Sequence, residues 1–223
     1  MTTLSREKVK CSVCGAVNEY VEIMSTNSFG SPDLDTRPPE IQRSTMRYWV
    51  QECPSCGYAA SQVSESCEVS ADFLKSDEYI SCDGIAFKSE LAKRFYKQYM
   101  IAAKADNSHD AFFALLHAVW ACDDAGDSSN AKLCRKKAAS LGLLLLNSHE
   151  AETFMLMCVD LMRRAGQFEE VISKYSSLHF RGDRWNNPDV MNAVLKFELE
   201  KARNEDDGCY TITEAMQNGQ QNK

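Results

Sequence analysis

The chain has 223 residues, of which 44% are hydrophobic, and its formal net charge at pH 7 is −7. This length allows one large or two small domains, and the hydrophobic share is sufficient for a packed core. An acidic chain disfavours broad nucleic-acid binding through phosphate neutralisation, although a local basic face would be compatible with it. The longest apolar stretch, residues 138–146, is far shorter than the roughly 20 residues that span a bilayer, so we expect no membrane partner.

The chain has ten cysteines, and the expected compartment decides whether their thiols stay reduced. Residues 1–6 show no apolar core of a signal peptide, so we expect a cytoplasmic protein whose thiols stay reduced. Six cysteines have irregular spacing. Of these, Cys122, Cys134 and Cys158 fall where a helical core is expected, and we interpret them as small buried hydrophobic side chains.

Two C-x-x-C-G motifs occupy the N-terminal part of the chain. Two intervening residues let both sulfur atoms of a turn reach one ion at about 2.3 Å, and the following glycine permits the backbone conformation that directs amides toward the thiolates. We predict one structural Zn²⁺ in a closed four-thiolate shell, which leaves no coordination position to activate water. Thiol switching and disulfide bonds are the alternatives. The predicted ligands are Cys11, Cys14, Cys53 and Cys56.

The segments around these motifs favour a zinc ribbon with a long insertion. The 38 residues between Cys14 and Cys53 exceed the spacing of about 15–20 in a compact ribbon, so an ordered insertion must return the chain to the site. Alternation around Glu22 and the aromatic run 47–50 predict strands beside both motifs. We therefore predict a zinc-ribbon-like β domain over residues 1–70, followed by a linker over 71–85.

From about residue 86 the pattern changes to helical periodicity. We predict a helical domain over residues 86–203 and a polar tail over 204–223. The predicted fold class is α+β, mostly α. The expected helices cover residues 87–105, 111–125, 130–146, 150–165 and 168–178, with another beginning near Pro188; Asn147 and Glu150 resemble a capping box for the fourth.

The central helices also repeat at an offset of 40 residues. The order of large, small and apolar residues, followed by glycine, resembles the tetratricopeptide pattern, in which small residues let paired helices approach closely. The resemblance implies stacked antiparallel hairpins with a concave groove, and grooves of this class bind peptides. The matched pairs include Leu115 with Met155, Cys122 with Met162, and Gly126 with Gly166.

The segment 31–40 (SPDLDTRPPE) together with 49–59 (WVQECPSCGYA) resembles an uncharacterised bacterial family, the domain of unknown function twenty-two twenty-five. The resemblance covers about the first 60 residues by motif and the rest of the chain by layout. Members of that family couple paired cysteine knuckles to a helical-repeat tail. The resemblance therefore implies a fold and a metal, and no established activity.

The insertion and the second motif hold further candidates for a partner site. Asp33, Asp35 and Arg37 could form a ligand or partner site on a loop held by a rigid scaffold. We favour a local ion-pair and turn network that stiffens the insertion together with its prolines. Trp49 could stack on a base or pack over the metal site.

The motifs of common enzymes are missing from the sequence: it contains no Gly-rich phosphate loop, no G-x-S-x-G and no H-E-x-x-H. We predict a non-catalytic, zinc-stabilised adaptor that binds a protein or peptide partner through its helical repeats. One alternative is a nucleic-acid-associated regulator that uses the zinc ribbon. The other is a redox sensor in which thiol oxidation releases zinc.

Overall fold

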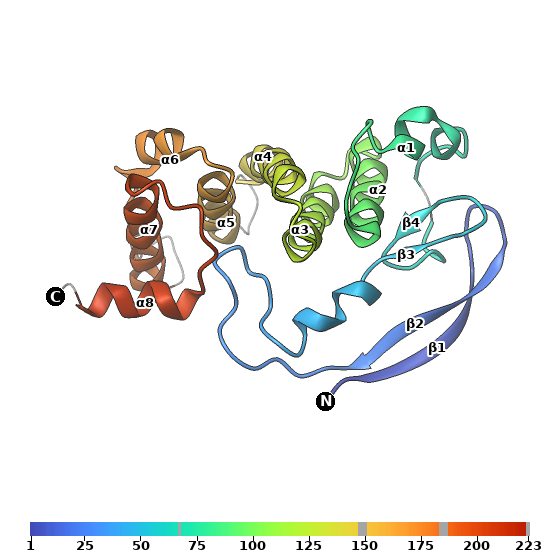
Figure 1. The fold of residues 1–223 in the computed structure, drawn as a ribbon, viewed down its shortest axis with the longest axis horizontal. Coiled ribbons are helices and arrows are strands. Elements are labelled where there is room, and N and C mark those ends of the chain that lie inside the picture. Colours follow the sequence, from blue (N-terminus) through green and yellow to red (C-terminus); the bar gives the residue numbers. More distant parts are fainter. Residues whose placement is uncertain (67, 147–150, 183–186, 222–223) are drawn as a thin grey trace. The chain divides into compact units, whose positions relative to one another are not determined.

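The computed structural model describes the chain except for residues 67, 147–150, 183–186 and 222–223. In the described part, helices dominate and the named strands form two small antiparallel sheets (Figure 1). The predicted α+β class with mostly α character is confirmed. None of the helices in these described ranges is long and apolar enough to cross a membrane.

The chain forms two compact units, and their limits differ from the predicted domain boundaries. The first unit contains residues 1–29 and 40–134, and the second contains 30–39 and 135–223. The predicted insertion loop is therefore shared between the units. We call residues 30–39 the finger, because this segment leaves the first unit and belongs to the second.

Each cysteine motif lies at the turn of one antiparallel hairpin in the first unit. β1 (Thr3–Lys10) pairs with β2 (Val17–Ser25) around the first motif. The second motif lies between the two-residue strands β3 (Gln51–Glu52) and β4 (Ala59–Ala60). A hairpin is the shortest way to bring both flanks of a turn together, and this geometry presents the two cysteines of each motif on one side.

The strand predicted over residues 47–50 is wrong, because this segment ends the 3₁₀ helix η1 (Arg43–Tyr48). The Thr45 hydroxyl donates to the Gln42 carbonyl oxygen at 2.7 Å and accepts from Trp49 Nε1 at 3.0 Å. Side-chain bonds to nearby groups of this kind compete with strand pairing. The strand begins only after the helix, at Gln51.

The predicted linker over residues 71–85 is folded. It contains the 3₁₀ helix η2 (Phe73–Lys75) and helix α1 (Asp77–Ser81). The Ser76 hydroxyl caps α1 by accepting the Tyr79 amide. The Tyr79 side chain is fully buried, and its hydroxyl donates to the Gly57 carbonyl oxygen at 2.7 Å. This segment therefore packs on the second cysteine motif.

Two capped helices complete most of the first unit. Helix α2 (Glu90–Lys104) begins after Ser89, and α3 (Ser108–Asp124) begins after Asn107; both capping side chains accept a main-chain amide of the first turn. α2 packs against α3 and β4. Most of α3 is buried, including Leu115 and Leu116, so it supplies the hydrophobic centre of this unit.

The second unit contains α5 (Ala151–Arg164), α6 (Phe168–Tyr175), α7 (Pro188–Arg203) and α8 (Ile212–Gln221). α7 packs against the other three helices. Helix α8 corrects the predicted polar tail over residues 204–223. It is amphipathic enough to bury Ala215, which forms a hydrophobic cluster with Leu34, Val194 and Phe197. The finger therefore contributes to the core of this unit through Leu34.

The helices expected from the sequence are present within a few residues of their predicted ends, and α4 (Ser128–Leu145) spans the limit between the two units. The 40-residue offset is also visible in the turns after α3 and α5. In each turn a glycine with positive φ is followed by an amide that donates back to the helix at 2.9 Å, a helix-end geometry that glycine favours. The matching bonds join Asp127 to Cys122 and Gln167 to Met162, beside Gly126 and Gly166. The capping box predicted at Asn147 and Glu150 lies outside the described residues.

Gly126 provides a test of this turn. Its φ is +62° with no neighbouring atom within contact distance of an added Cβ. Gly126→Ala should therefore lower the free energy of unfolding by about 1 kcal/mol through backbone strain alone. Gly126→Asn should cost less, because asparagine tolerates this conformation better. Urea denaturation measures both, and an alanine variant as stable as the wild type would contradict the assignment.

Candidate metal centre

The four predicted ligands converge in the first unit. The Sγ atoms of Cys11 and Cys56 are 3.7 Å apart, and those of Cys14 and Cys53 are 3.6 Å apart. All four sulfur atoms lie within 4.8 Å of one another. Four ligands at about 2.3 Å from a tetrahedral ion are separated by about 3.8 Å. The sulfur positions thus fit one tetrahedral ion, and zinc suits this donor set.

The two motifs have the same backbone conformation. In each, the amide of the glycine donates to the carbonyl of the first cysteine, at 3.0 Å for Gly15 and 2.8 Å for Gly57. These glycines have φ values of +74° and +75°, which other residues adopt only with strain. The amide of each first cysteine closes the turn by donating to the residue after the glycine, at 2.8 Å.

Hydrogen bonds outside the sheets connect the first motif to the segment that follows β4. The Ser12 amide donates to the Val63 carbonyl oxygen at 2.9 Å, and the Ser12 hydroxyl donates to the Glu65 carbonyl oxygen at 2.5 Å. The Val63 amide in turn donates to Gln51 Oε1 at 3.0 Å. These bonds hold the two hairpins at the separation that the four sulfur atoms need.

The four cysteines differ in exposure. Cys11 and Cys53 are buried, Cys56 is half-buried and Cys14 is exposed. Burial opposes ionisation of Cys53, but main-chain amides of Ser55 and Cys56 and the neighbouring thiols lower its pKa to about 7. Amides that point at sulfur favour the thiolate, which is the form that binds a metal.

Several residues that support the centre were not predicted. The Tyr20 hydroxyl donates to the Glu52 carbonyl oxygen at 3.2 Å, and burial together with the nearby thiolates raises the pKa of Tyr20 to about 12. Lys97 Nζ lies 2.5 Å from Glu52 Oε1 and 5.4 Å from the Tyr79 ring centroid. Alternation along β2 could have indicated Tyr20, whereas no local signal links the other two to the motif.

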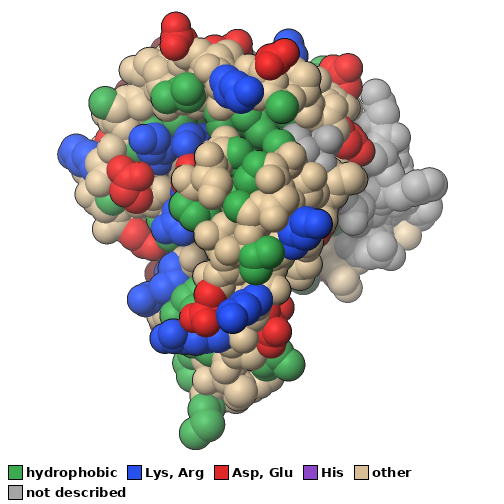
Figure 2. All heavy atoms as spheres, turned by 90° about the vertical axis from the view of Figure 1, so that its right-hand side faces the viewer, with side chains coloured by type: hydrophobic (Ala, Val, Ile, Leu, Met, Phe, Trp, Pro, Cys, Tyr) green, Lys and Arg blue, Asp and Glu red, His purple; other side chains and the backbone are tan. Residues whose placement is uncertain are grey.

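The aromatic residues beside the second motif are engaged inside the first unit. Tyr58 is 3% exposed, and its hydroxyl donates to the Glu65 carbonyl oxygen at 3.2 Å, so its ring is not available to a base. The Trp49 ring contacts the rings of His117 and Trp120 on α3, at 5.2 and 6.4 Å between centroids. Figure 2 shows one face of the molecule, on which Lys and Arg side chains lie among Asp and Glu side chains.

The finger residues proposed as a partner site are buried in the second unit. Asp33, Asp35 and Arg37 are 3%, 0% and 7% exposed. The Arg37 amide donates to Asp35 Oδ1 at 3.2 Å, which is part of the turn network favoured from the sequence. Asp35 Oδ2 accepts from Arg164 Nη1 of α5 at 3.0 Å. An ion pair between distant segments thus accompanies the local turn.

A second buried ion cluster lies beside the first. Arg163 is fully buried and donates from Nη2 to Asp160 Oδ1 at 2.8 Å and from Nε to Glu198 Oε2. Its Nη1 donates to the carbonyl oxygens of Asp206 and Gly208 at 2.7 and 2.9 Å. Arg163 therefore joins α5 to α7 and to the loop before α8.

Four of the six other cysteines are buried: Cys82, Cys122, Cys134 and Cys158. This confirms the hydrophobic role predicted for the last three. Cys209 is exposed, and Cys67 lies outside the described residues.

Comparisons of the chain with protein-family models, with curated proteins and with solved structures find no match. The resemblance to the family of paired cysteine knuckles therefore stays an expectation that rests on the motifs themselves.

Removal of the Asp35 carboxylate tests whether the finger is structural. Asp35→Ala leaves Arg164 buried without its nearest anion and should lower the free energy of unfolding by about 3 kcal/mol. The control is Arg6→Ala, since the Arg6–Glu19 pair is exposed and should contribute about 0.5 kcal/mol or less. Chemical denaturation measures both. Unchanged stability of Asp35→Ala, with loss of a bound partner, would instead support a partner site.

The Glu198 carboxyl should make stability depend on pH. Burial, followed by the charge of Asp160, raises the pKa of Glu198 to about 8, although Arg163 opposes the shift. The unfolded value is about 4.3, so folding takes up a proton and the free energy of unfolding falls as pH rises from about 4.3 to 8.

Glu198→Gln should flatten that decline, because glutamine does not titrate. Glu200→Gln, on the same helix but only half-buried, is the control that should keep the decline. Urea denaturation at several pH values between 5 and 9 gives the slopes. Equal slopes in the wild type and Glu198→Gln would show that Glu198 is not the titrating group.

Proposed function

We propose that the protein is a non-catalytic, zinc-stabilised adaptor that binds a protein partner. The metal site is supported by the sulfur geometry: Sγ atoms of the first motif lie 3.6 and 3.7 Å from Sγ atoms of the second. Four protein thiolates fill a tetrahedral shell, so a zinc ion there has no open position for water or substrate. Such an ion contributes to folding and supplies no chemistry at a substrate.

A structural ion is needed at this place for a physical reason. β3 and β4 have two residues each, and a short isolated hairpin is marginally stable in water. Zinc bound to both motifs would hold this hairpin to the longer one. The free energy of metal binding would then become free energy of folding for this part of the first unit.

The partner-binding part of the proposal is supported by the architecture. The helices come in successive pairs with a repeated turn, an arrangement that resembles tetratricopeptide-like repeats and is used for binding protein segments. Such a binding role needs no catalytic residues. Affinity purification in which a stoichiometric partner is retained by the zinc-loaded chain and lost after chelation would support this part.

Metal content is the first test. Elemental mass spectrometry of protein purified under reducing conditions without chelator should give one zinc per chain. Cys53→Ser should lose most of this zinc, because a four-thiolate site loses a ligand that is fully buried. Cys209→Ser, which changes an exposed cysteine of the second unit, should retain it. Absence of zinc from freshly reduced wild-type protein would rule out the metal site and favour a thiol switch.

A further inference from the structure

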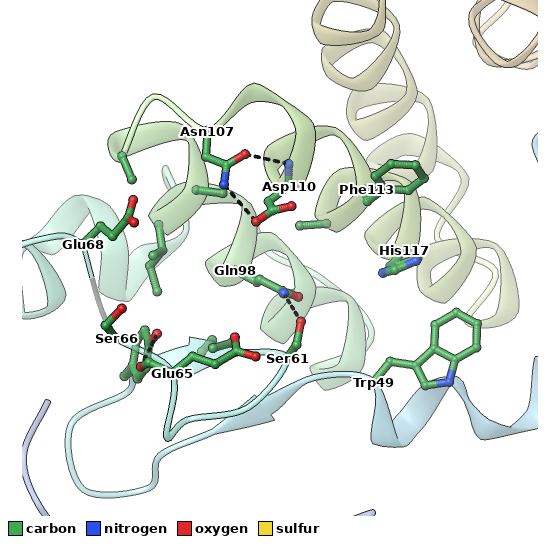
Figure 3. Close-up of a pocket in the computed structure, with 17 residues that line it drawn as sticks. Trp49, Ser61, Glu65, Ser66, Glu68, Gln98, Asn107, Asp110, Phe113 and His117 are labelled. Atoms are coloured by element: carbon green, nitrogen blue, oxygen red, sulfur yellow. Dashed lines mark hydrogen bonds between the residues drawn. The ribbon is translucent and has the colours of Figure 1, made fainter. Parts of the chain in front are cut away.

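A cavity of about 380 Å³ lies within the first unit, beside the segment that follows β4. Its walls come from residues 58–61, Glu65, Ser66 and Glu68 on one side and from residues of α2 and α3 on the other (Figure 3). This volume is in the range of about 300–1,000 Å³ that small ligands and side chains occupy in proteins. The cavity does not include a ligand of the metal centre.

One end of the cavity is aromatic. Trp49, Phe113 and His117 line it (Figure 3). The indole is fixed by its bond to Thr45, and the imidazole packs against Trp49 and Phe95 at 5.2 and 5.1 Å. Burial lowers the pKa of His117 to about 4, so the imidazole is neutral at neutral pH and does not repel a cation.

The other end is acidic and contains an unused acceptor. Glu65, Glu68 and Asp110 line it, and the described lining residues include no Lys or Arg. Gln98 donates from Nε2 to Ser61 Oγ at 3.1 Å, whereas its buried Oε1 has no hydrogen-bond partner. A buried acceptor without a donor is unfavourable, so a ligand with N–H groups would be stabilised here.

The Glu65 segment of the acidic side is held by the first cysteine motif. The Glu65 carbonyl oxygen accepts from the hydroxyls of Ser12 and Tyr58, and Ser12 lies between the first two cysteines. The backbone that carries the Glu65 carboxylate is thus bonded to the first cysteine motif. We expect the cavity to keep its shape only while the four sulfur atoms stay together.

We propose that this cavity binds the guanidinium group of an arginine side chain presented by a protein partner. The proposal rests on the proposed adaptor role and names the chemistry of the partner. A guanidinium is planar, stacks on aromatic rings and donates in several directions at once. Those properties match an aromatic wall, three carboxylates and the Gln98 oxygen. A lysine ammonium lacks the planar face, and a neutral side chain gains nothing from the carboxylates.

NMR titration of the zinc-loaded, ¹⁵N-labelled full chain tests the proposal with two small probes. N-acetyl-arginine methylamide should shift the Trp49 indole N–H and the Gln98 side-chain amide signals in a saturable way. N-acetyl-citrulline methylamide has nearly the same shape without the charge and should bind at least several-fold more weakly. Equal binding of the two probes, no saturable shift at Trp49 and Gln98, or tighter binding of N-acetyl-lysine methylamide would each overturn the assignment.

Removal of carboxylates shows whether the arginine probe binds in the cavity or is only attracted by the net negative charge of the chain. The variant Glu65→Gln/Glu68→Gln/Asp110→Asn should bind the arginine probe about tenfold more weakly, since each partly exposed carboxylate contributes roughly a factor of two. The control Glu7→Gln/Asp72→Asn/Glu78→Gln removes three exposed carboxylates outside the cavity and should bind like the wild type. Equal weakening in both triple variants would show nonspecific attraction and overturn the site.

The metal measurement makes the two proposals fail separately. A wild-type chain that holds one zinc yet binds no arginine probe would reject the cavity and leave the adaptor proposal standing. A chain without zinc would reject the metal part whatever the cavity binds.

Discussion

The first unit depends on the convergence of four sulfur atoms from two hairpins. The motifs are separated by 38 residues, and the strands around the second one contain two residues each. Main-chain pairing at that length does not hold a hairpin in place. The Ser12 bonds to the segment after β4 and the Tyr79 bond to the Gly57 carbonyl oxygen both end on the motifs. Hydrogen bonds therefore connect the cysteine motifs to helix α1 and to the Glu65 segment of the cavity.

What the sequence predicts correctly is encoded locally. The C-x-x-C-G spacing and its glycine define a turn within five residues, and both turns are present with matching hydrogen bonds. The helices follow from apolar periodicity and from caps such as Ser89, which lie within one turn of the residues they affect. The 40-residue offset is visible in the sequence because the turns after α3 and α5 both require glycine.

One error has a local cause: the aromatic run 47–50 has strand composition, yet Thr45 bonds to Gln42 and Trp49 stabilise the 3₁₀ helix that ends at Tyr48. The other errors have physical causes that lie outside a local window. Residues 71–85 lack clear periodicity and fold because Tyr79 finds an acceptor in the distant second motif. Asp35 has its ion-pair partner 129 residues away, and nothing near either residue specifies that pairing. Trp49 contacts His117 on α3, which is also distant in the chain, so no local sequence pattern predicts the cavity.

The finger makes the two units interdependent through the chain itself. Its stem is closed in the first unit by the Phe29 amide, which donates to the Glu40 carbonyl oxygen at 2.7 Å. Its tip belongs to the second unit, where the Leu34 amide donates to the Tyr210 carbonyl oxygen at 2.9 Å. Unfolding of the second unit therefore releases a segment whose flanking residues, Phe29 and Glu40, stay hydrogen-bonded to each other in the first unit.

The two units nevertheless satisfy their buried polar groups by different means. In the first, four cysteine sulfur atoms lie within 4.8 Å of one another, and the proposed zinc site would make stability follow metal supply. In the second, Arg163 and Arg164 form ion pairs with Asp160 and Asp35, and the buried Glu198 carboxyl, whose pKa is raised to about 8, makes stability depend on pH. Because the finger carries Asp35 from the insertion between the cysteine motifs into that ion cluster, one chain segment links both dependencies.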